Sequence, residues 1–380
     1  MRGNGGRKRR DNGAASETDA TSLLEQVARA DARDAGLLYV TGSEPGYSRV
    51  RTGKSFSYRD IDGRPLKDKA EIARVRKLAI PPAYTDVWIC ASPRGHIQAT
   101  GRDARGRKQY RYHEKWRATR DATKFDHILD FADNLPTMRA RVLLDLRRQG
   151  LPREKVLATI VFLLENTLAR IGNEEYARSN RSYGLTTLRD RHVAVEGSSL
   201  RFNFMGKSGK EWKLKFTDRR VARIVRACQE LPGQHLFQYI DDEGQRQKIT
   251  SADLNDYLRE IAGDEVTAKD FRTWAGTVLA AMALAEFEQF DSKAAAQRNL
   301  RQAIEHVARQ LGNTPTICRK CYIHPEILSC YLEGTLIETL QQRIKQALRR
   351  EEKLKPEEAA VLAVLRTRLE EEARRKAKAA

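Results

Sequence analysis

Residues 170–188 read RIGNEEYARSNRSYGLTTL, and they follow directly on a strongly apolar segment. Residues 152–172 begin with a proline, end with a glycine and carry apolar side chains at helical spacing between them. This pattern predicts a buried helix with Arg170 near its end. A guanidinium in that position either forms an ion pair in the core or binds an anion.

The periodicity of the chain changes near residue 120. Residues 37–99 contain short apolar runs separated by turns rich in Gly and Pro, which predict strands. Later segments show mainly helical spacing, except for alternating apolar residues between 193 and 217 that predict a small antiparallel sheet. The expected fold class is α+β, with a small β-rich domain at 36–118 and a larger, mainly α-helical domain at 119–340.

The two ends of the chain differ from the middle in composition. Residues 1–20 are rich in Gly, Arg and Asn, which is typical of a disordered basic tail. Residues 351–380 are dense in charge and rich in Ala, so we expect an exposed, charged C-terminal helix or tail with a frayed end.

The net charge favours a polyanionic partner. The 70 Lys and Arg against 51 Asp and Glu give +19, and neutralising phosphates releases condensed counterions. Nucleic acid is therefore the expected partner, ahead of an anionic membrane surface. No apolar run approaches the roughly 20 residues of a membrane helix, and no secretory signal is evident. The five cysteines then favour a reducing cytoplasm.

Residues 314–328 read TPTICRKCYIHPEIL, in which Cys318 and Cys321 have the spacing of half a metal site. A second ligand pair at similar spacing is lacking, and His324 stands beside a proline in a segment of helical character. The threonine and proline at its start predict a short helix that ends before Pro325. Free thiols are the preferred interpretation, although a redox role stays open.

The sequence predicts no cofactor. The two Gly-Lys-Ser sequences at 53–55 and 206–208 lack the earlier glycine of a phosphate-binding loop. Neither an ATP site nor a complete metal site is therefore expected.

Two further segments carry cations in specific places. Residues 267–277 read TAKDFRTWAGT, and their spacing puts Lys269 and Arg272 on one face at the start of an apolar helix. Lys207 lies in the turn between two predicted strands. Taken singly, each of these side chains is most often solvated or ion-paired, and only their combination with Tyr322 is specific.

From about residue 36 to 335, these segments resemble the type IB DNA topoisomerases, specifically the poxvirus-like and bacterial branch. The resemblance implies the tyrosine recombinase/topoisomerase IB catalytic fold, arranged as a clamp that closes around double-stranded DNA. It also implies a monomer associated with the nucleoid. The catalytic residues that it implies are Tyr322, Arg170, Lys207, Arg272 and Asn313.

The resemblance also assigns roles within this set. Tyr322 is the implied nucleophile, two arginines bind the phosphate, and Lys207 is the implied general acid. Asn313 stands nine residues before Tyr322, where the family usually has a histidine. An amide can still donate a hydrogen bond to a phosphate oxygen, but it lacks the charge of an imidazolium.

Further residues are implied as DNA contacts. Lys269 matches a phosphate-contacting lysine, and Tyr176 a backbone contact. The stretch GRDARGRKQYRYHEKW resembles the family's DNA-reading strand, which would place four side chains against the duplex: Lys108, Gln109, Tyr110 and Tyr112.

The implied activity is relaxation of supercoils through a 3′-phosphotyrosyl intermediate at Tyr322, followed by religation, without ATP or metal. A tyrosine site-specific recombinase is one alternative, but such enzymes typically carry a histidine where Lys269 stands. A non-enzymatic, basic DNA-binding protein is the other, and it leaves the combination of cations with Tyr322 unexplained.

Overall fold

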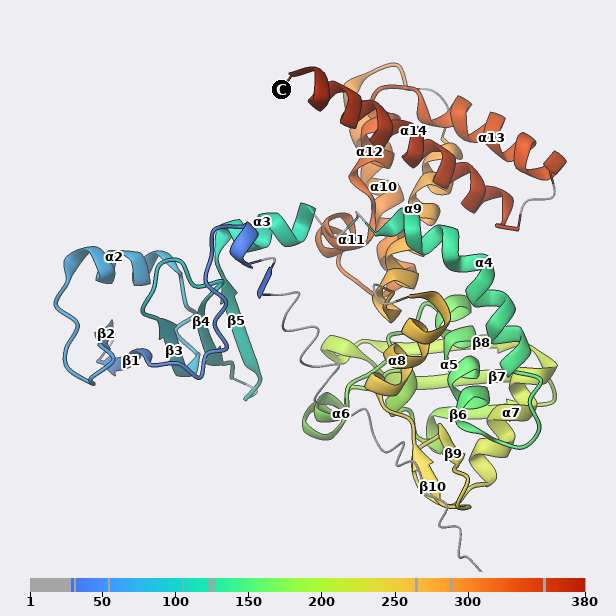
Figure 1. The fold of residues 1–380 in the computed structure, drawn as a ribbon, viewed down its shortest axis with the longest axis horizontal. Helices are drawn as coiled ribbons and strands as arrows, with labels where there is room; N and C mark the ends of the chain where they lie inside the picture. The colour runs from blue at the N-terminus through green and yellow to red at the C-terminus, as the bar shows by residue number, and fades with distance from the viewer. Residues whose placement is uncertain are drawn as a thin grey trace, which may run out of the picture. The chain divides into compact units, whose positions relative to one another are not determined.

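The computed structural model describes residues 29–379, except 31, 54, 105, 123–124, 126, 264–265, 288–289 and 351–352. The chain divides into two compact units, Met1–Lys124 and Phe125–Ala380 (Figure 1). The α+β fold class is confirmed. The domain limits 36–118 and 119–340 stay predictions, and the predicted tail at 1–20 lies outside the described residues.

The first unit contains a five-stranded antiparallel sheet in the order β2-β1-β3-β4-β5. Its strands are β1 (Gly46–Thr52), β2 (Ser55–Arg59), β3 (Thr85–Cys90), β4 (Ile97–Arg102) and β5 (Lys108–Tyr112). Helices α2 (Lys69–Lys77) and α3 (Glu114–Ala122) belong to the same unit. Val75 of α2 packs on Val87 and Ile89 of the sheet to form a small core. The strand β5 is an edge strand, so one side of its backbone is not paired within the sheet.

The second unit is mainly helical (Figure 1). The helices that precede α9 in the sequence are α4 (Ile128–Asp145), α5 (Arg153–Thr167), α6 (Glu174–Asn180), α7 (Arg219–Glu230) and α8 (Ser251–Ala262). The later ones are α9 (Ala268–Ala285), α10 (Lys293–Leu311), α11 (Pro315–Tyr322), α12 (Pro325–Leu332), α13 (Leu336–Arg350) and α14 (Pro356–Ala379). Helix α9 packs against α4, α5, α8 and every later helix, so it forms the centre of this unit.

The predicted antiparallel sheet is present in the second unit, in the order β6 (Val193–Glu196), β7 (Ser199–Met205), β8 (Glu211–Thr217). Leu200, Phe202 and Phe204 are buried, whereas the residues between them are exposed, as the alternation predicted. A short 3₁₀ turn, Lys207–Gly209, joins β7 to β8. A second hairpin, formed by β9 (Gln238–Ile240) and β10 (Arg246–Lys248), was not predicted from the sequence.

The predicted end of the buried helix was wrong. Helix α5 ends at Thr167, because Leu168 adopts a left-handed conformation with φ 56°. Arg170 therefore lies in the loop after the helix rather than near its end. Leu168 and Ile171 still pack on the core, so the apolar pattern continues past Thr167. The pattern therefore gave no sign that the helix ends there.

The expectation of an exposed C-terminal helix was wrong for the first half of α14, whereas residues 366–375 are mostly exposed, as expected. Ala360, Val361 and Leu365 of α14 are fully buried, and α14 packs along α13 and against α4, α9 and α12 (Figure 1). Small alanine side chains allow this close packing, and Glu358, Arg366 and Arg368 form ion pairs with residues of α4 and α12. None of the described helices is long and apolar enough to cross a membrane.

Candidate active site

Four of the five predicted catalytic residues lie together in the second unit. Arg170 Nη2 donates to Asn313 Oδ1 and, at 3.4 Å, to the carbonyl of Gly312. Arg272 Cζ lies 5.2 Å from the centroid of the Tyr322 ring. These side chains come from the loop after α5, from α9, from the turn between α10 and α11, and from the end of α11.

Arg272 is the most buried member of the cluster, with a relative exposure of 3%. It donates to the carbonyl of Leu168 and, at 2.7 Å, to that of Leu311. Within the described part of the chain, its Nε has no hydrogen-bond partner. Burial, followed by the charge of Arg170, lowers the Arg272 pKa to about 10. An anion placed between these two guanidiniums would relieve both effects, because it supplies an opposite charge and an acceptor.

The motif at 170–188 folds back on itself and thereby fixes the loop that carries Arg170. The N–H of Leu185 donates to the Arg170 carbonyl at 2.8 Å. Gly184 packs so closely here that a Cβ on it would lie 2.5 Å from that carbonyl oxygen and 2.4 Å from the nitrogen of Gly172. Burial lowers the pKa of Arg170 as well, while Tyr322 opposes this shift. The motif thus holds a poorly solvated cation toward Tyr322.

Helix α11 presents Tyr322 at its last position. Thr314 accepts from the N–H of Ile317 as its N-cap, and a proline occupies the first turn, as predicted. Gly276 of α9 allows the close approach of this helix end, since a Cβ there would lie 2.5 Å from the Tyr322 carbonyl oxygen. The half-buried Tyr322 is therefore held against the same helix that carries Arg272.

Asn313 follows the glycine that ends α10. Gly312 has φ 62°, and the N–H of Asn313 donates to the Ala308 carbonyl at 2.9 Å. The side-chain oxygen accepts from Arg170, whereas the buried Nδ2 has no partner among the described residues. The amide therefore leaves both N–H donors of this nitrogen without a partner among the described residues.

Lys207 is not brought into contact with the other four residues. It lies exposed at the start of the turn between β7 and β8, and its side chain forms no hydrogen bond or ion pair among the described residues. Lys269 is exposed in the first turn of α9, in contrast to the buried Arg272. Tyr176 in α6 is also exposed, at 45%.

The four predicted DNA contacts in the first unit lie on β5, where they alternate in direction. Lys108, Tyr110 and Tyr112 are exposed, and the two tyrosine rings stack with centroids 5.9 Å apart. Lys108 Nζ lies 5.5 Å from the centroid of the Tyr110 ring. Gln109 has the opposite orientation, and its Nε2 donates to Asp103 Oδ2 at 3.0 Å. The edge strand thus exposes one cation and two aromatic rings side by side.

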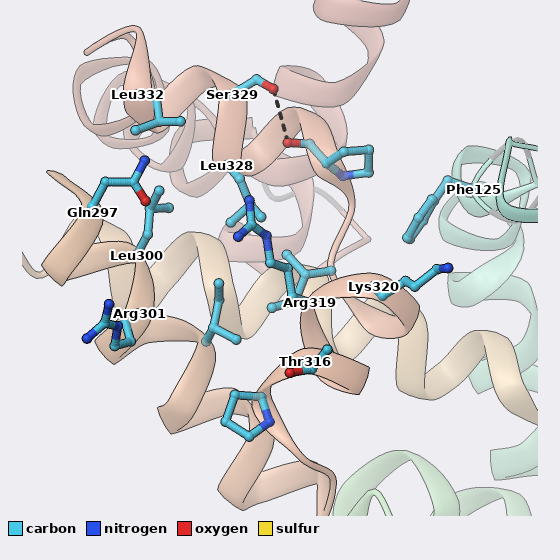
Figure 2. A pocket seen from close by; sticks show the side chains of 14 residues that line it. Phe125, Gln297, Leu300, Arg301, Thr316, Arg319, Lys320, Leu328, Ser329 and Leu332 are labelled. Atoms are coloured by element: carbon cyan, nitrogen blue, oxygen red, sulfur yellow. Dashed lines mark hydrogen bonds between the residues drawn. The ribbon is translucent and has the colours of Figure 1, made fainter. Parts of the chain in front are cut away.

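The two cysteines beside Tyr322 have different surroundings. Cys318 is fully buried, and burial raises its pKa to about 11; Cys321 is partly exposed. The outer side of α11 borders a groove of about 710 Å³ that α10 and α12 complete (Figure 2). Arg301, Arg319 and Lys320 line this groove above buried leucines and isoleucines. The described residues contain no cluster of three or more metal-ligating side chains.

Sequence reasoning did not identify the backbone acceptors that orient the two arginines. These are the carbonyls of Leu168, Leu311 and Gly312. No residue type marks a carbonyl acceptor in a sequence. Gly276, within the quoted stretch at 267–277, and Gly312, two residues before the stretch at 314–328, permit the close approaches and were the signal available.

A tyrosine set against one buried and one half-buried guanidinium, on a mainly helical α+β unit, defines a candidate phosphoryl-transfer site. A family model described as eukaryotic DNA topoisomerase I, catalytic core, matches residues 113–356. A second, described as bacterial DNA topoisomerase IB, N-terminal domain, matches residues 55–103.

Individual relatives agree with the family models. The chain is 33% identical over 295 residues to DNA topoisomerase 1B of Acanthamoeba polyphaga mimivirus, covering 75% of this chain and 87% of the relative. It is 19% identical to DNA topoisomerase 1B of Vaccinia virus (strain Copenhagen), covering 77% and 92%. Identity to DNA topoisomerase 1 of Mycosarcoma maydis is 24%, covering 62% and 26%. The chain belongs to the type IB DNA topoisomerase family.

Proposed function

We propose that this topoisomerase relaxes supercoiled double-stranded DNA by reversible transesterification at Tyr322. The phenolic oxygen attacks a backbone phosphorus, a 3′-phosphotyrosyl ester forms, and the 5′ oxygen leaves as a hydroxyl. The freed strand rotates, and the 5′ hydroxyl then attacks the phosphotyrosine to reseal the strand. The observation that carries this proposal is the position of Tyr322 beside Arg272, whose buried Nε donor has no partner in the described structure.

The two arginines act on the charge of the transition state. Negative charge spreads over the equatorial oxygens of the pentacoordinate phosphorus as the phenol attacks. Guanidiniums held in place by backbone carbonyls stabilise that charge without reorganising during the reaction. The free Nδ2 donor of Asn313 supplies a further hydrogen bond to a non-bridging oxygen.

Lys207 is the proposed proton donor to the leaving 5′ oxygen. An alkoxide is a poor leaving group, and a lysine ammonium can protonate it as the bond breaks. Its position on an exposed hairpin turn leaves the ammonium available to a bound duplex. In this proposal, the Lys207 side chain extends from its turn to the phosphate that Tyr322 attacks once DNA is bound.

The exchange of one phosphate ester for another conserves bond energy. Resealing therefore requires no ATP, and the two guanidiniums supply the charge for which many phosphoryl-transfer enzymes use a metal ion.

The remaining predicted residues are proposed to bind the duplex. Lys108 neutralises a phosphate, while Tyr110 and Tyr112 pack against the DNA beside it, and Gln109 supports the loop through Asp103. Lys269 and Tyr176 contact the backbone near the cleaved phosphate. We further propose that the protein acts as a monomer on nucleoid DNA in the cytoplasm.

The test is relaxation of negatively supercoiled plasmid in EDTA without ATP. The proposal expects a ladder of relaxed topoisomers with the native protein, and none with Tyr322→Phe at equal DNA occupancy. Binding without relaxation by the native protein would instead indicate a non-enzymatic DNA-binding protein. Exchange between two defined sites would indicate a recombinase.

A further inference from the structure

Trp212 of β8 contacts two separate turns with one edge of its indole ring. A Cβ on Gly206 would lie 2.7 Å from both Cδ1 and Nε1 of this ring. A Cβ on Gly312 would lie 2.4 Å from its Cζ2. Side-chain carbons do not approach one another so closely, so the ring fits only because both residues lack a Cβ.

The two turns carry different parts of the proposed catalytic set. Gly206 immediately precedes Lys207, and its N–H closes the hairpin turn on the Lys210 carbonyl at 2.8 Å. Gly312 immediately precedes Asn313, and its own carbonyl accepts from Arg170 at 3.4 Å. One edge of the indole ring therefore lies between two turns. One turn carries Lys207, the proposed proton donor, and the other carries Asn313 and the carbonyl that accepts from Arg170.

The ring itself has little freedom to move. Trp212 is 6% exposed, and Phe204 pairs with it across β7 and β8. The two rings are stacked, with centroids 6.3 Å apart and planes at 4°. A side chain with two torsions, packed on this aromatic neighbour, makes a rigid spacer.

The two turns differ in how many other contacts hold them. The N–H of Gly312 caps α10, and the carbonyls beside it accept from both arginines. In the described structure, the backbone hydrogen bonds of residues 206–210 join residues of the same turn, and the Lys207 side chain forms no hydrogen bond or ion pair with a described residue. A change in the indole should thus displace the Lys207 turn more than the Gly312 turn.

We propose that Trp212 is a positioning residue that fixes the Lys207 turn relative to Arg170 and Asn313. The proposal rests on the proposed role of Lys207 as the general acid. It follows that loss of the indole edge impairs protonation of the leaving group, whereas phosphate binding is largely retained.

The test compares two duplexes that differ only in the atom leaving at the cleavage site, a 5′ oxygen or a 5′ sulfur. Sulfur departs without protonation, so it bypasses the general acid. Trp212→Phe shortens the ring, and we expect single-turnover cleavage of the oxygen substrate to fall on the order of 10²-fold. Cleavage of the sulfur substrate should stay close to the rate of the native protein.

A second variant tests the contact without removing the ring. Gly206 has φ −96°, a conformation open to alanine, so Gly206→Ala adds only a methyl group against the indole. It should show the same selective loss on the oxygen substrate. Phe216→Leu is the matched control, because Phe216 lies on the same face of β8 and packs on Phe162, away from the turn. It should slow neither substrate selectively.

Lys207→Ala distinguishes failure of the acid role of Lys207 from failure of the positioning role of Trp212. If sulfur does not restore its cleavage, the acid role of Lys207 fails, and the positioning role fails with it. If the sulfur substrate does restore cleavage by Lys207→Ala, the acid role stands. The positioning role alone is then overturned if folded Trp212→Phe and Gly206→Ala cleave the oxygen and sulfur substrates with equally reduced rates. The positioning role is also overturned if both variants cleave the oxygen substrate as fast as the native protein does. Circular dichroism and duplex affinity establish that each variant is folded.

Discussion

Arg272 and Tyr322 face each other in the candidate site, with the guanidinium carbon 5.2 Å from the centroid of the tyrosine ring. The guanidinium is also bound to backbone carbonyls of Leu168 and Leu311, which belong to two other segments. One side chain on the central helix α9 therefore fixes the loop after α5 and the end of α10 around the proposed nucleophile.

Substitution of Arg272 by lysine should abolish most of the cleavage activity. An ammonium cannot bond both carbonyls and still present a planar pair of donors to a phosphate. We expect the single-turnover cleavage rate to fall on the order of 10²–10³-fold, the usual effect of losing one preorganised donor. Duplex affinity is measured in parallel as the control. A rate for Arg272→Lys within a few-fold of the native protein would contradict this role.

Position 313 should tolerate a side chain that donates a hydrogen bond, but not one that only accepts. Asn313→Asp removes the free Nδ2 and sets a carboxylate beside Arg170, which neutralises the guanidinium. We expect cleavage to fall on the order of 10²-fold or more. Asn313→His restores a donor at this position, so it should retain activity or increase it. Equal activities of the aspartate and histidine variants, measured at matched occupancy, would exclude Asn313 from phosphate binding.

Stability should depend on pH through His324. Burial lowers its pKa to about 4, despite the opposing charge of Glu372. The folded state therefore keeps the ring neutral while the unfolded state takes up a proton below its ordinary pKa. Stability is full above that ordinary value and falls as the pH drops toward 4. The expected loss in unfolding free energy is about 3 kcal/mol.

His324→Asn isolates this contribution. His324 Nδ1 accepts from the N–H of Glu326 as the N-cap of α12, and asparagine can keep that cap without titrating. Urea unfolding at pH 7 and near pH 4.5 gives the two free energies for each protein. The variant should lose less stability on acidification than the native protein. Parallel losses in the two proteins would show that His324 does not titrate on unfolding.

The ion pair between Arg139 and Glu358 should contribute strongly to the docking of α14. Glu358 is 6% exposed, and Arg139 contacts both Glu358 and Glu165 at 2.7 Å. Removing one partner leaves a charge without full compensation, so Glu358→Ala should cost on the order of 3 kcal/mol.

An exposed ion pair on the same helix serves as the control. Arg366 and Asp133 pair near the surface, with side chains 48% and 46% exposed. Arg366→Ala should therefore cost less than about 1 kcal/mol. Similar losses for Arg366→Ala and Glu358→Ala in urea unfolding would show that the buried pair has no special role.

Residue patterns within short segments of the sequence predicted the helices and strands that carry the candidate site. Alternation in residues 200–216 located the β7–β8 hairpin and the turn with Lys207. The Thr-Pro pair after Asn313 marked the start of the short helix, so the positions of Asn313 and Tyr322 relative to that helix followed.

The parts that could not be predicted depend on tertiary packing. The left-handed Leu168 ends α5 within an apolar run, and its carbonyl then accepts from Arg272, more than one hundred residues away. The burial of α14 depends on acidic and basic partners in α4 and α12, which its own sequence does not reveal.

The most direct test of the central claim is the identity of the residue that becomes bound to DNA. The native protein is denatured during cleavage of a duplex, digested with protease, and the nucleotide-bearing peptide is sequenced by mass spectrometry. The account predicts a nucleotide joined through its 3′ phosphate to Tyr322, and no adduct in Tyr322→Phe at equal duplex occupancy. A nucleotide on another residue, or an adduct that persists in Tyr322→Phe, would contradict it.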